Sequence, residues 1–198
     1  PVDLHLKGFG VLGANQAIEG GIIEISAQYL NGGEVYLDFP SVGATENIIL
    51  AAVSAKGRTV ISNCATEPEI IDLADFLIKA GAKISGAGSD TIVVDGVESL
   101  RGIEHSVIPD RIEAGTFMLA AAGAGGKCRI NNIITEHIKP IILKLREMEV
   151  DVEEYENSVV VSSEGNVVNT DIKTMPYPGF PTDMQAQFTA LMAKGVGT

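Results

Sequence analysis

The clearest pattern in the chain is an apolar stripe at helical spacing between residues 68 and 80. Its members recur every three or four residues: Ile70, Leu73, Ala74, Leu77 and Ala80. This spacing places side chains on one face of an α-helix. Thr66, Pro68 and Glu69 precede the stripe in the arrangement of a capping box, with Thr66 as the cap. The pattern therefore predicts an amphipathic helix that begins just after Thr66.

A second stripe with the same spacing follows Thr135. Its members are Ile138, Ile141, Ile142, Leu145 and Met148. The helix before each stripe also repeats, at a constant offset of 69 residues that aligns Leu50-Ala51-Ala52, Leu119-Ala120-Ala121 and Phe188-Thr189-Ala190. The aligned segments predict helices over 45–55, 115–124 and 184–193. A repeat of this length indicates stacked supersecondary units.

Strand-like runs complete each repeat. Strands are predicted over 58–63 and 127–132, each ending in Asn, and hairpins pair 82–84 with 91–94 and 151–152 with 158–161. Residues 1–38 read as the end of an earlier unit, with a hairpin strand over 21–25, and residues from about 178 begin another. The sequence thus predicts an α/β fold with helices packed on mixed sheets, built from two complete βαβαββ-like units and two partial ones.

Composition narrows the function classes. The formal net charge is -12, which argues against nucleic acid as a partner, because such binding needs a basic face. No apolar run reaches the roughly 18 residues that a membrane-spanning helix needs, and the first residues do not resemble a signal peptide. We therefore expect no membrane association and a cytoplasmic location.

Cysteine and histidine are scattered. Cys64 and Cys128 lie near the ends of strand-like runs and have no ligand-spaced neighbours, so we predict two buried thiols. His5, His105 and His137 are also far apart in the sequence, which disfavours a zinc site. We expect neither a metal nor a cofactor.

Asp183 is the strongest candidate for chemistry. Two prolines, Pro178 and Pro181, favour an extended entry, and a run of helix-forming residues follows Asp183. An aspartate at a helix start is usually an N-cap, which accepts a backbone N–H of the first turn. The alternative is a general base that faces a cleft and removes a proton from a substrate hydroxyl.

Ser41, Val42 and Gly43 precede the predicted helix that begins near Thr45. A Ser-x-Gly turn at a helix start offers a hydroxyl and backbone N–H groups to a diphosphate. A capping serine followed by a turn glycine explains the same residues. The local pattern alone leaves both interpretations open.

Four strings of residues resemble the UDP-N-acetylglucosamine 1-carboxyvinyltransferase family of enolpyruvyl transferases. They are residues 180–187 (FPTDMQAQ), 1–5 (PVDLH), 41–45 (SVGAT) and 109–113 (PDRIE), in the family's order. The resemblance extends over essentially the whole chain. Because the family is longer at both ends, we expect an internal fragment.

The resemblance implies a fold, a reaction and site residues. The fold is an inside-out α/β barrel of βαβαββ units, incomplete here, with residues 1–108 ending a first domain and 109–198 starting a second. The reaction transfers the enolpyruvyl group of phosphoenolpyruvate to the 3-hydroxyl of UDP-N-acetylglucosamine, with Asp183 as base. The resemblance assigns the uridine part to Pro1, Val2, Asp3 and Leu4, as an extended segment whose carboxylate can pair with the edge of the uracil ring. It assigns the diphosphate to Ser41, Val42 and Gly43, and the sugar to Asp183.

The resemblance also shows what this chain does not supply. The family's cysteine-bearing loop and most of its phosphate-binding Lys and Arg residues precede Pro1 or follow Thr198. Cys64 and Cys128 do not match that cysteine, and Phe39 stands where some members carry Lys. We therefore expect the fragment to be inactive alone, with helix N-termini as local sources of positive potential.

Other interpretations stay open at this stage. The charged residues beside turns, Glu67, Glu69, Arg111 and Glu113, are interpreted first as capping, hinge or solvated residues. The related 3-phosphoshikimate 1-carboxyvinyltransferase and a non-catalytic repeat scaffold are alternative functions. Open strand edges of an incomplete unit invite self-association.

Overall fold

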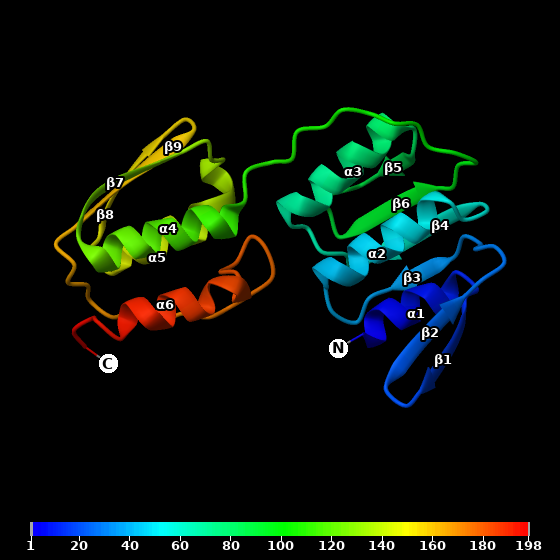
Figure 1. Ribbon diagram of the computed structural model, residues 1–198, viewed down its shortest axis with the longest axis horizontal. Coiled ribbons are helices and arrows are strands. Elements are labelled where there is room, and N and C mark those ends of the chain that lie inside the picture. Colours follow the sequence, from blue (N-terminus) through cyan, green and yellow to red (C-terminus); the bar gives the residue numbers. More distant parts are fainter. Residues whose placement is uncertain (1, 198) are drawn as a thin grey trace. The chain divides into compact units, whose positions relative to one another are not determined.

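The computed structural model describes residues 2–197, which form two compact units that divide between Val107 and Ile108 (Figure 1). Each unit has its own apolar core. The fold class is α/β, as the repeat predicted, and neither unit contains a closed barrel among its described residues.

Unit 1 is built on a mixed four-stranded sheet. Its strands lie in the order β3 (Glu34–Tyr36), β4 (Arg58–Ser62), β6 (Thr91–Asp95) and β5 (Lys83–Ser85). The β3–β4 pair is parallel and the other pairs are antiparallel. A separate two-stranded hairpin consists of β1 (Asn15–Glu19) and β2 (Ile22–Ser26). The predicted 82–84 and 91–94 hairpin is confirmed as β5–β6.

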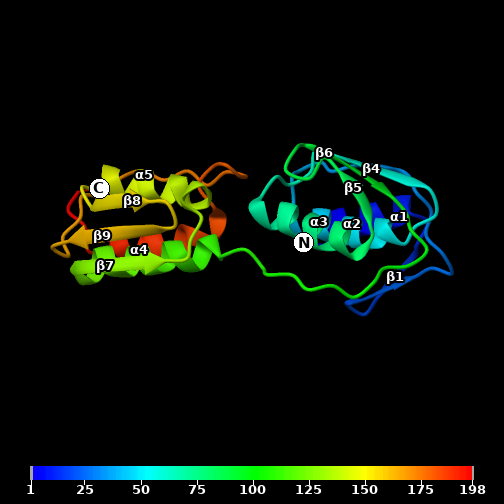
Figure 2. The same ribbon diagram turned by 90° about the horizontal axis from the view of Figure 1, so that it is seen from above.

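Three helices cover this sheet: α1 (Asp3–Val11), α2 (Val42–Val53) and α3 (Pro68–Ala80) (Figures 1 and 2). The stripe predicted for α3 is confirmed, because Ile70, Ala74, Leu77 and Ala80 are buried. The capping box is placed differently, since the N-cap residue is Glu67 and its side chain makes no capping hydrogen bond. Gly81 ends the helix in the left-handed conformation, at φ 113°, which glycine adopts readily.

Helix α1 was not predicted from the sequence. It contains two glycines, which lower helix propensity by about 1 kcal/mol each relative to alanine. Gly8 is buried, and a Cβ there would overlap the side chain of Ile48 in α2. The helix is therefore stabilised by close packing on α2, a contact that local propensity does not report.

Unit 2 contains a three-stranded antiparallel sheet in the order β7-β9-β8. Its elements in chain order are α4 (Arg111–Ala124), β7 (Gly126–Asn131), η1 (Thr135–Ile138), α5 (Lys139–Glu147), β8 (Asp151–Tyr155), β9 (Ser158–Ser163), η2 (Thr182–Met184) and α6 (Gln185–Met192). All five members of the second predicted stripe are buried. The β8–β9 hairpin and the helix–strand order are as predicted.

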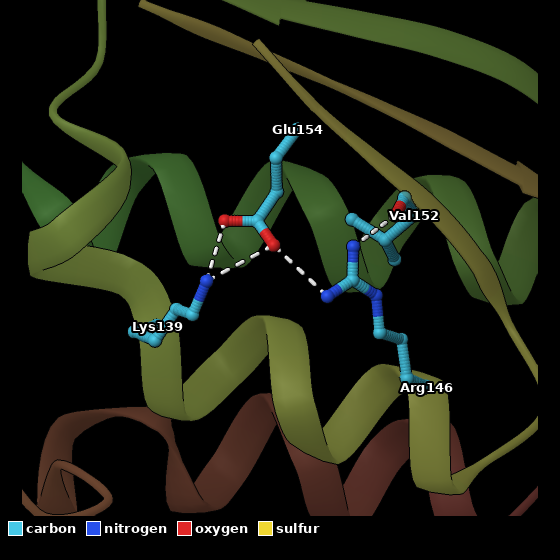
Figure 3. Close-up of polar contacts among 4 residues, drawn as sticks. All are labelled: Lys139, Arg146, Val152 and Glu154. Atoms are coloured by element: carbon cyan, nitrogen blue, oxygen red, sulfur yellow. Dashed lines mark hydrogen bonds and ion pairs between the residues drawn. The ribbon is translucent and has the colours of Figure 1, made fainter. Parts of the chain in front are cut away.

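A charged network joins α5 to β8 (Figure 3). Lys139 Nζ lies 2.9 Å and Arg146 Nη1 also 2.9 Å from the two carboxylate oxygens of Glu154. Arg146 donates a further hydrogen bond of 2.6 Å to the backbone oxygen of Val152. Bonds from Lys139 first and Arg146 second hold the pKa of Glu154 below its ordinary value. The network fixes the amphipathic helix against the sheet edge.

The repeat predicted from the sequence is visible in the structure, with one exception. Asn63 and Asn132, which follow β4 and β7 at the 69-residue offset, both have left-handed backbones, at φ 57° and 56°. Asparagine tolerates this conformation better than most residues, which explains why both copies end in Asn. The exception lies before α4. Residues 96–110 contain no strand, so the second expected βαβαββ unit lacks its first strand.

The two cysteines differ in exposure. Cys64 is buried, as predicted, and its burial raises the pKa of the thiol to about 11. Cys128 lies exposed on β7, so the prediction of a buried thiol there is wrong. Within residues 2–197, no helix combines the length and apolar character needed to cross a bilayer.

Candidate functional site

The first turn of α1 carries the segment that the resemblance assigned to uridine. Val2 occupies the position before the helix, Asp3 is exposed in its first turn, and Leu4 packs against the core of unit 1. Pro1 lies outside the described residues. The prediction of an extended backbone is wrong from Asp3 onward, because the helix begins there. A carboxylate in a first turn is favoured by the helix dipole.

Three contacts bring this turn beside the start of α2. His5 Nδ1 lies 2.8 Å from Asn47 Nδ2 and accepts its hydrogen bond, since an amide NH₂ only donates. A Cβ on Gly43 would lie 3.3 Å from His5 Cε1, so the glycine permits this approach. Lys7 Nζ lies 2.8 Å from Asp38 Oδ2 and ties α1 to the loop before α2. Recognising His5 and Lys7 would have required predicting α1.

Ser41 is the N-cap of α2. Its Oγ accepts a hydrogen bond of 3.3 Å from the Ala44 N–H, and its carbonyl accepts one of 2.9 Å from the Thr45 N–H. Within residues 2–197, the N–H groups of Val42 and Gly43 make no backbone–backbone or side-chain hydrogen bond. The capping interpretation is therefore confirmed for the hydroxyl. The same turn still offers two backbone donors to an anion.

Asp183 lies in unit 2, in the 3₁₀ turn η2 that leads into α6. Its side chain is exposed, and no hydrogen bond or ion pair involves it among residues 2–197. The N-cap positions of η2 and α6 belong to Pro181 and Met184, so the interpretation of Asp183 as an N-cap is wrong. Within residues 2–197, the Asp183 carboxylate therefore has no hydrogen bond or ion pair that would give it a structural role.

The backbone around Asp183 is firmly held. The adjacent Met184 is fully buried and lies against Gly115 and Thr116 of α4. Gln187 donates a hydrogen bond of 3.1 Å to Thr116 Oγ1. Phe180 packs edge-on against Phe188, with 4.8 Å between ring centroids. An exposed carboxylate on a fixed backbone suits a group that must meet a substrate atom at a set position.

Two of the charged residues noted beside turns lie at the start of α3. Glu67 is buried at the N-cap position of α3, and Glu69 lies in its first turn. Burial, and then repulsion from Glu69, raise the pKa of Glu46 in α2. The repulsion shows that Glu46 of α2 and Glu69 of α3 lie close together within unit 1.

The charged residues at the start of α4 surround its cap. Asp110 accepts hydrogen bonds of 2.7 Å and 3.1 Å from the N–H groups of Ile112 and Glu113. The Arg111 guanidinium lies 5.9 Å from the centroid of the Tyr177 ring. The turn preceding Asp183 and the start of α4 therefore meet within unit 2.

A cavity of about 430 Å³ lies beside α6 and was not anticipated from the sequence. Gln185, Thr189 and Met192 form one wall, and the other consists of Asn169, Thr170, Asp171, Ile172 and Thr174. Asp183 is not among the lining residues. Within residues 2–197, no group of three or more His, Cys, Asp or Glu side chains is placed to hold a metal ion.

Solved structures with the same architecture are enolpyruvyl transferases. The crystal structure of the enolpyruvyl transferase NikO from Streptomyces tendae matches with a TM-score of 0.85 at 24% identity, over 100% of this chain and 50% of that one. EPSP synthase from Acinetobacter baumannii matches with a TM-score of 0.61 at 21% identity, over 89% of this chain and 42% of that one. The fold is therefore of the enolpyruvyl-transferase class.

The sequence assigns the family. The family model for EPSP synthase (3-phosphoshikimate 1-carboxyvinyltransferase) matches residues 1–197, and the chain belongs to this family. A UDP-N-acetylglucosamine 1-carboxyvinyltransferase 1 from Caldanaerobacter subterraneus subsp. tengcongensis is 58% identical over 198 residues, and one from Halothermothrix orenii is 52% identical. Each alignment covers 100% of this chain and 48% of the relative. The chain thus spans about half the length of the curated relatives it matches.

Proposed function

We propose that this chain is part of an enzyme that transfers the enolpyruvyl group of phosphoenolpyruvate to the 3-hydroxyl of UDP-N-acetylglucosamine. The supporting observation is that this chain is 52–58% identical, over its full length, to relatives named UDP-N-acetylglucosamine 1-carboxyvinyltransferase. The placement of α1 and α2 agrees with this proposal, because both segments assigned to the nucleotide lie together in unit 1.

The nucleotide would bind at the first turns of α1 and α2. The free N–H groups of Val42 and Gly43, at the positive end of α2, would face the diphosphate. Asp3 would accept a hydrogen bond from the uracil edge. This arrangement supplies anion affinity without a basic surface, which reconciles the charge of -12 with two anionic substrates.

Asp183 would act as general base. As its carboxylate takes the proton of the 3-hydroxyl, that oxygen bonds to C2 of phosphoenolpyruvate and a proton adds to C3. The tetrahedral adduct then loses a C3 proton and inorganic phosphate to give the enolpyruvyl ether. No redox or metal step is needed in this proposal. The reaction would belong to peptidoglycan synthesis, and hence to cell-wall growth, cell shape and division, in the cytoplasm.

Asp183→Asn tests this role in a version of the protein with the missing segments restored. We expect turnover to fall by roughly 10² to 10⁴, because a positioned base contributes about that factor, while binding of UDP-N-acetylglucosamine changes little. The matched control is Asp151→Asn, an exposed aspartate on β8. Unchanged turnover in Asp183→Asn would remove Asp183 from the mechanism.

The substrate is tested separately by phosphate release from phosphoenolpyruvate. The acceptors are UDP-N-acetylglucosamine and shikimate 3-phosphate, since the family model carries the name of the second activity. We expect release only with the sugar nucleotide, and only in the restored version. Release with shikimate 3-phosphate alone would assign the alternative activity, and no release with either acceptor would favour a scaffold.

We also propose that the chain alone self-associates through the β1–β2 hairpin. Among the described residues β2 pairs only with β1, and Ile18 and Ile22 are 62% and 73% exposed. A free strand edge with exposed apolar side chains favours pairing with another copy. Light scattering should show a mass above 20.8 kDa that decreases when Ile22→Lys is introduced.

A further inference from the structure

The segment that leaves unit 1 is held by side chains although its backbone is almost unbonded. Arg101 N–H donates a hydrogen bond of 2.9 Å to the Ala80 oxygen. Beyond it, residues 102–109 make no backbone–backbone hydrogen bond with any described residue. Yet the side chain of His105, in the middle of this segment, is only 7% exposed. A specific contact must therefore hold His105 in place.

His105 lies between two charged residues of α3. Its Nε2 is 2.9 Å from Asp72 Oδ1, and its Nδ1 is 3.3 Å from Lys79 Nζ. The ring of Phe76 packs against the imidazole at 5.6 Å and 80°. Asp72, Phe76 and Lys79 follow one another at spacings of four and three, so they share one face of the helix.

The hydrogen-bonding chemistry of Asp72 and Lys79 fixes which nitrogen of the His105 ring carries the proton. An ammonium group only donates hydrogen bonds, so Nδ1 must accept from Lys79. The ring proton is then on Nε2 and is donated to the Asp72 carboxylate. A neutral imidazole satisfies both partners at once. Arg101 adds a second attachment, because its guanidinium donates two hydrogen bonds of 3.3 Å to the Lys79 oxygen at the end of α3.

The repeat indicates that this attachment replaces a strand. Residues 103–105 lie 69 residues after β3, which pairs in parallel with β4. Among the described residues β7, the counterpart of β4, pairs only with β9. The segment that would extend the second sheet is instead bound to α3 of unit 1 through His105.

We propose that His105 is a positioning residue that fastens the connecting segment to α3 and confines bending between the units to residues 106–109. The next fixed point is Asp110, the N-cap of α4. Release of His105 would extend the free tether to residues 102–109, which doubles its length. The effective concentration of one linked unit at the other falls as about the −3/2 power of tether length. Doubling the tether would therefore lower this effective concentration to roughly a third. The proposal does not depend on the reaction assigned above.

The first test measures cleavage of the 198-residue protein by a Glu-specific protease after Glu104, followed by mass spectrometry. We expect Asp72→Ala to speed this cleavage about tenfold or more, since loss of a hydrogen bond to a charged group raises the population of the open segment. Asp72→Asn should stay within about twofold of the parent, because the amide oxygen still accepts from Nε2. Neither change alters the cleavage site.

The matched control is Asp75→Ala, which removes an exposed carboxylate from the same helix without a contact to the segment. Equal cleavage rates in Asp72→Ala and Asp75→Ala would overturn the proposal. Circular dichroism at the assay temperature establishes that each variant is folded.

A second measurement covers the case in which Asp72→Ala destabilises α3. Spin labels on Cys128 and on Ser54→Cys report the distance distribution between the units. His105→Ala should broaden this distribution, whereas His105→Gln should leave its width as in the parent, because its amide nitrogen can donate to Asp72 in place of Nε2. Equal widths in His105→Ala and the parent would refute the attachment.

Discussion

Replacing Gly8 by alanine tests whether close packing of α1 on α2 holds the candidate nucleotide site together. The added Cβ would overlap Cγ1 and Cδ1 of Ile48, which is fully buried. Overpacking of this kind costs about 1–3 kcal/mol. Alanine returns about 1 kcal/mol through its higher helix propensity. We therefore expect a net loss of up to about 2 kcal/mol in the free energy of unfolding of unit 1.

The loss should be visible in both heat and urea. For a unit of this size, about 1 kcal/mol corresponds to a fall of roughly 4–8 °C in Tm. Gly10→Ala, in the same helix, is the control, because the nearest atom to its Cβ is the end of the Gln16 side chain at 3.0 Å. The end of this side chain can shift, at the cost of weakening its hydrogen bond to the Leu6 oxygen, so Gly10→Ala should cost less than Gly8→Ala.

A double-mutant cycle isolates the contact. Ile48→Ala removes both overlapping atoms, so Gly8→Ala should cost less in that background than in the parent, by about 1–3 kcal/mol. If Gly8→Ala costs no more stability than Gly10→Ala does, the packing explanation of α1 is wrong. The helix would then depend on local propensity alone.

Two further predictions concern charge and thiol reactivity. Glu154→Gln should cost about 1 kcal/mol at neutral pH, whereas Glu156→Gln, an exposed control in the β8–β9 turn, should cost little. Because the folded-state pKa of Glu154 lies below the ordinary 4.5, its contribution is present above pH 4.5 and is lost as the pH falls through the lower value, so urea titrations of parent and variant should converge in acid. A thiol reagent at pH 8 should modify Cys128 within minutes and leave Cys64 unmodified until unfolding, since Cys64 is buried with a thiol pKa of about 11. Modification of both cysteines at equal rates would contradict this burial.

The apolar periodicity of α3 and α5 was sufficient to predict both helices. Their stripes are long and regular, and each buries one face against a sheet, so the local pattern and the tertiary packing agree. The hairpins were predictable for the same reason, because alternating residues and turn residues act over short distances. Asp183 was found at a helix start because prolines and helix-forming residues mark that boundary.

The features that the sequence did not predict depend on contacts between distant residues. Helix α1 exists because Gly8 fits against Ile48, forty residues away, and its formation turned the expected extended segment at Asp3 into a first turn. Cys128 is exposed because β7 lies at the edge of its sheet, a position that composition does not reveal.

The sequence by itself determined the repeat, the fold class and the family, because each can be recognised from short-range patterns and from strings of consecutive residues. Tertiary structure decided which segments meet. It brought His5 of α1 into contact with Asn47 of α2. It also placed residues 103–105 against the face of α3, where the repeat predicts a strand. Such contacts depend on how side chains far apart in the chain fit together, and local propensity carries no information about that fit.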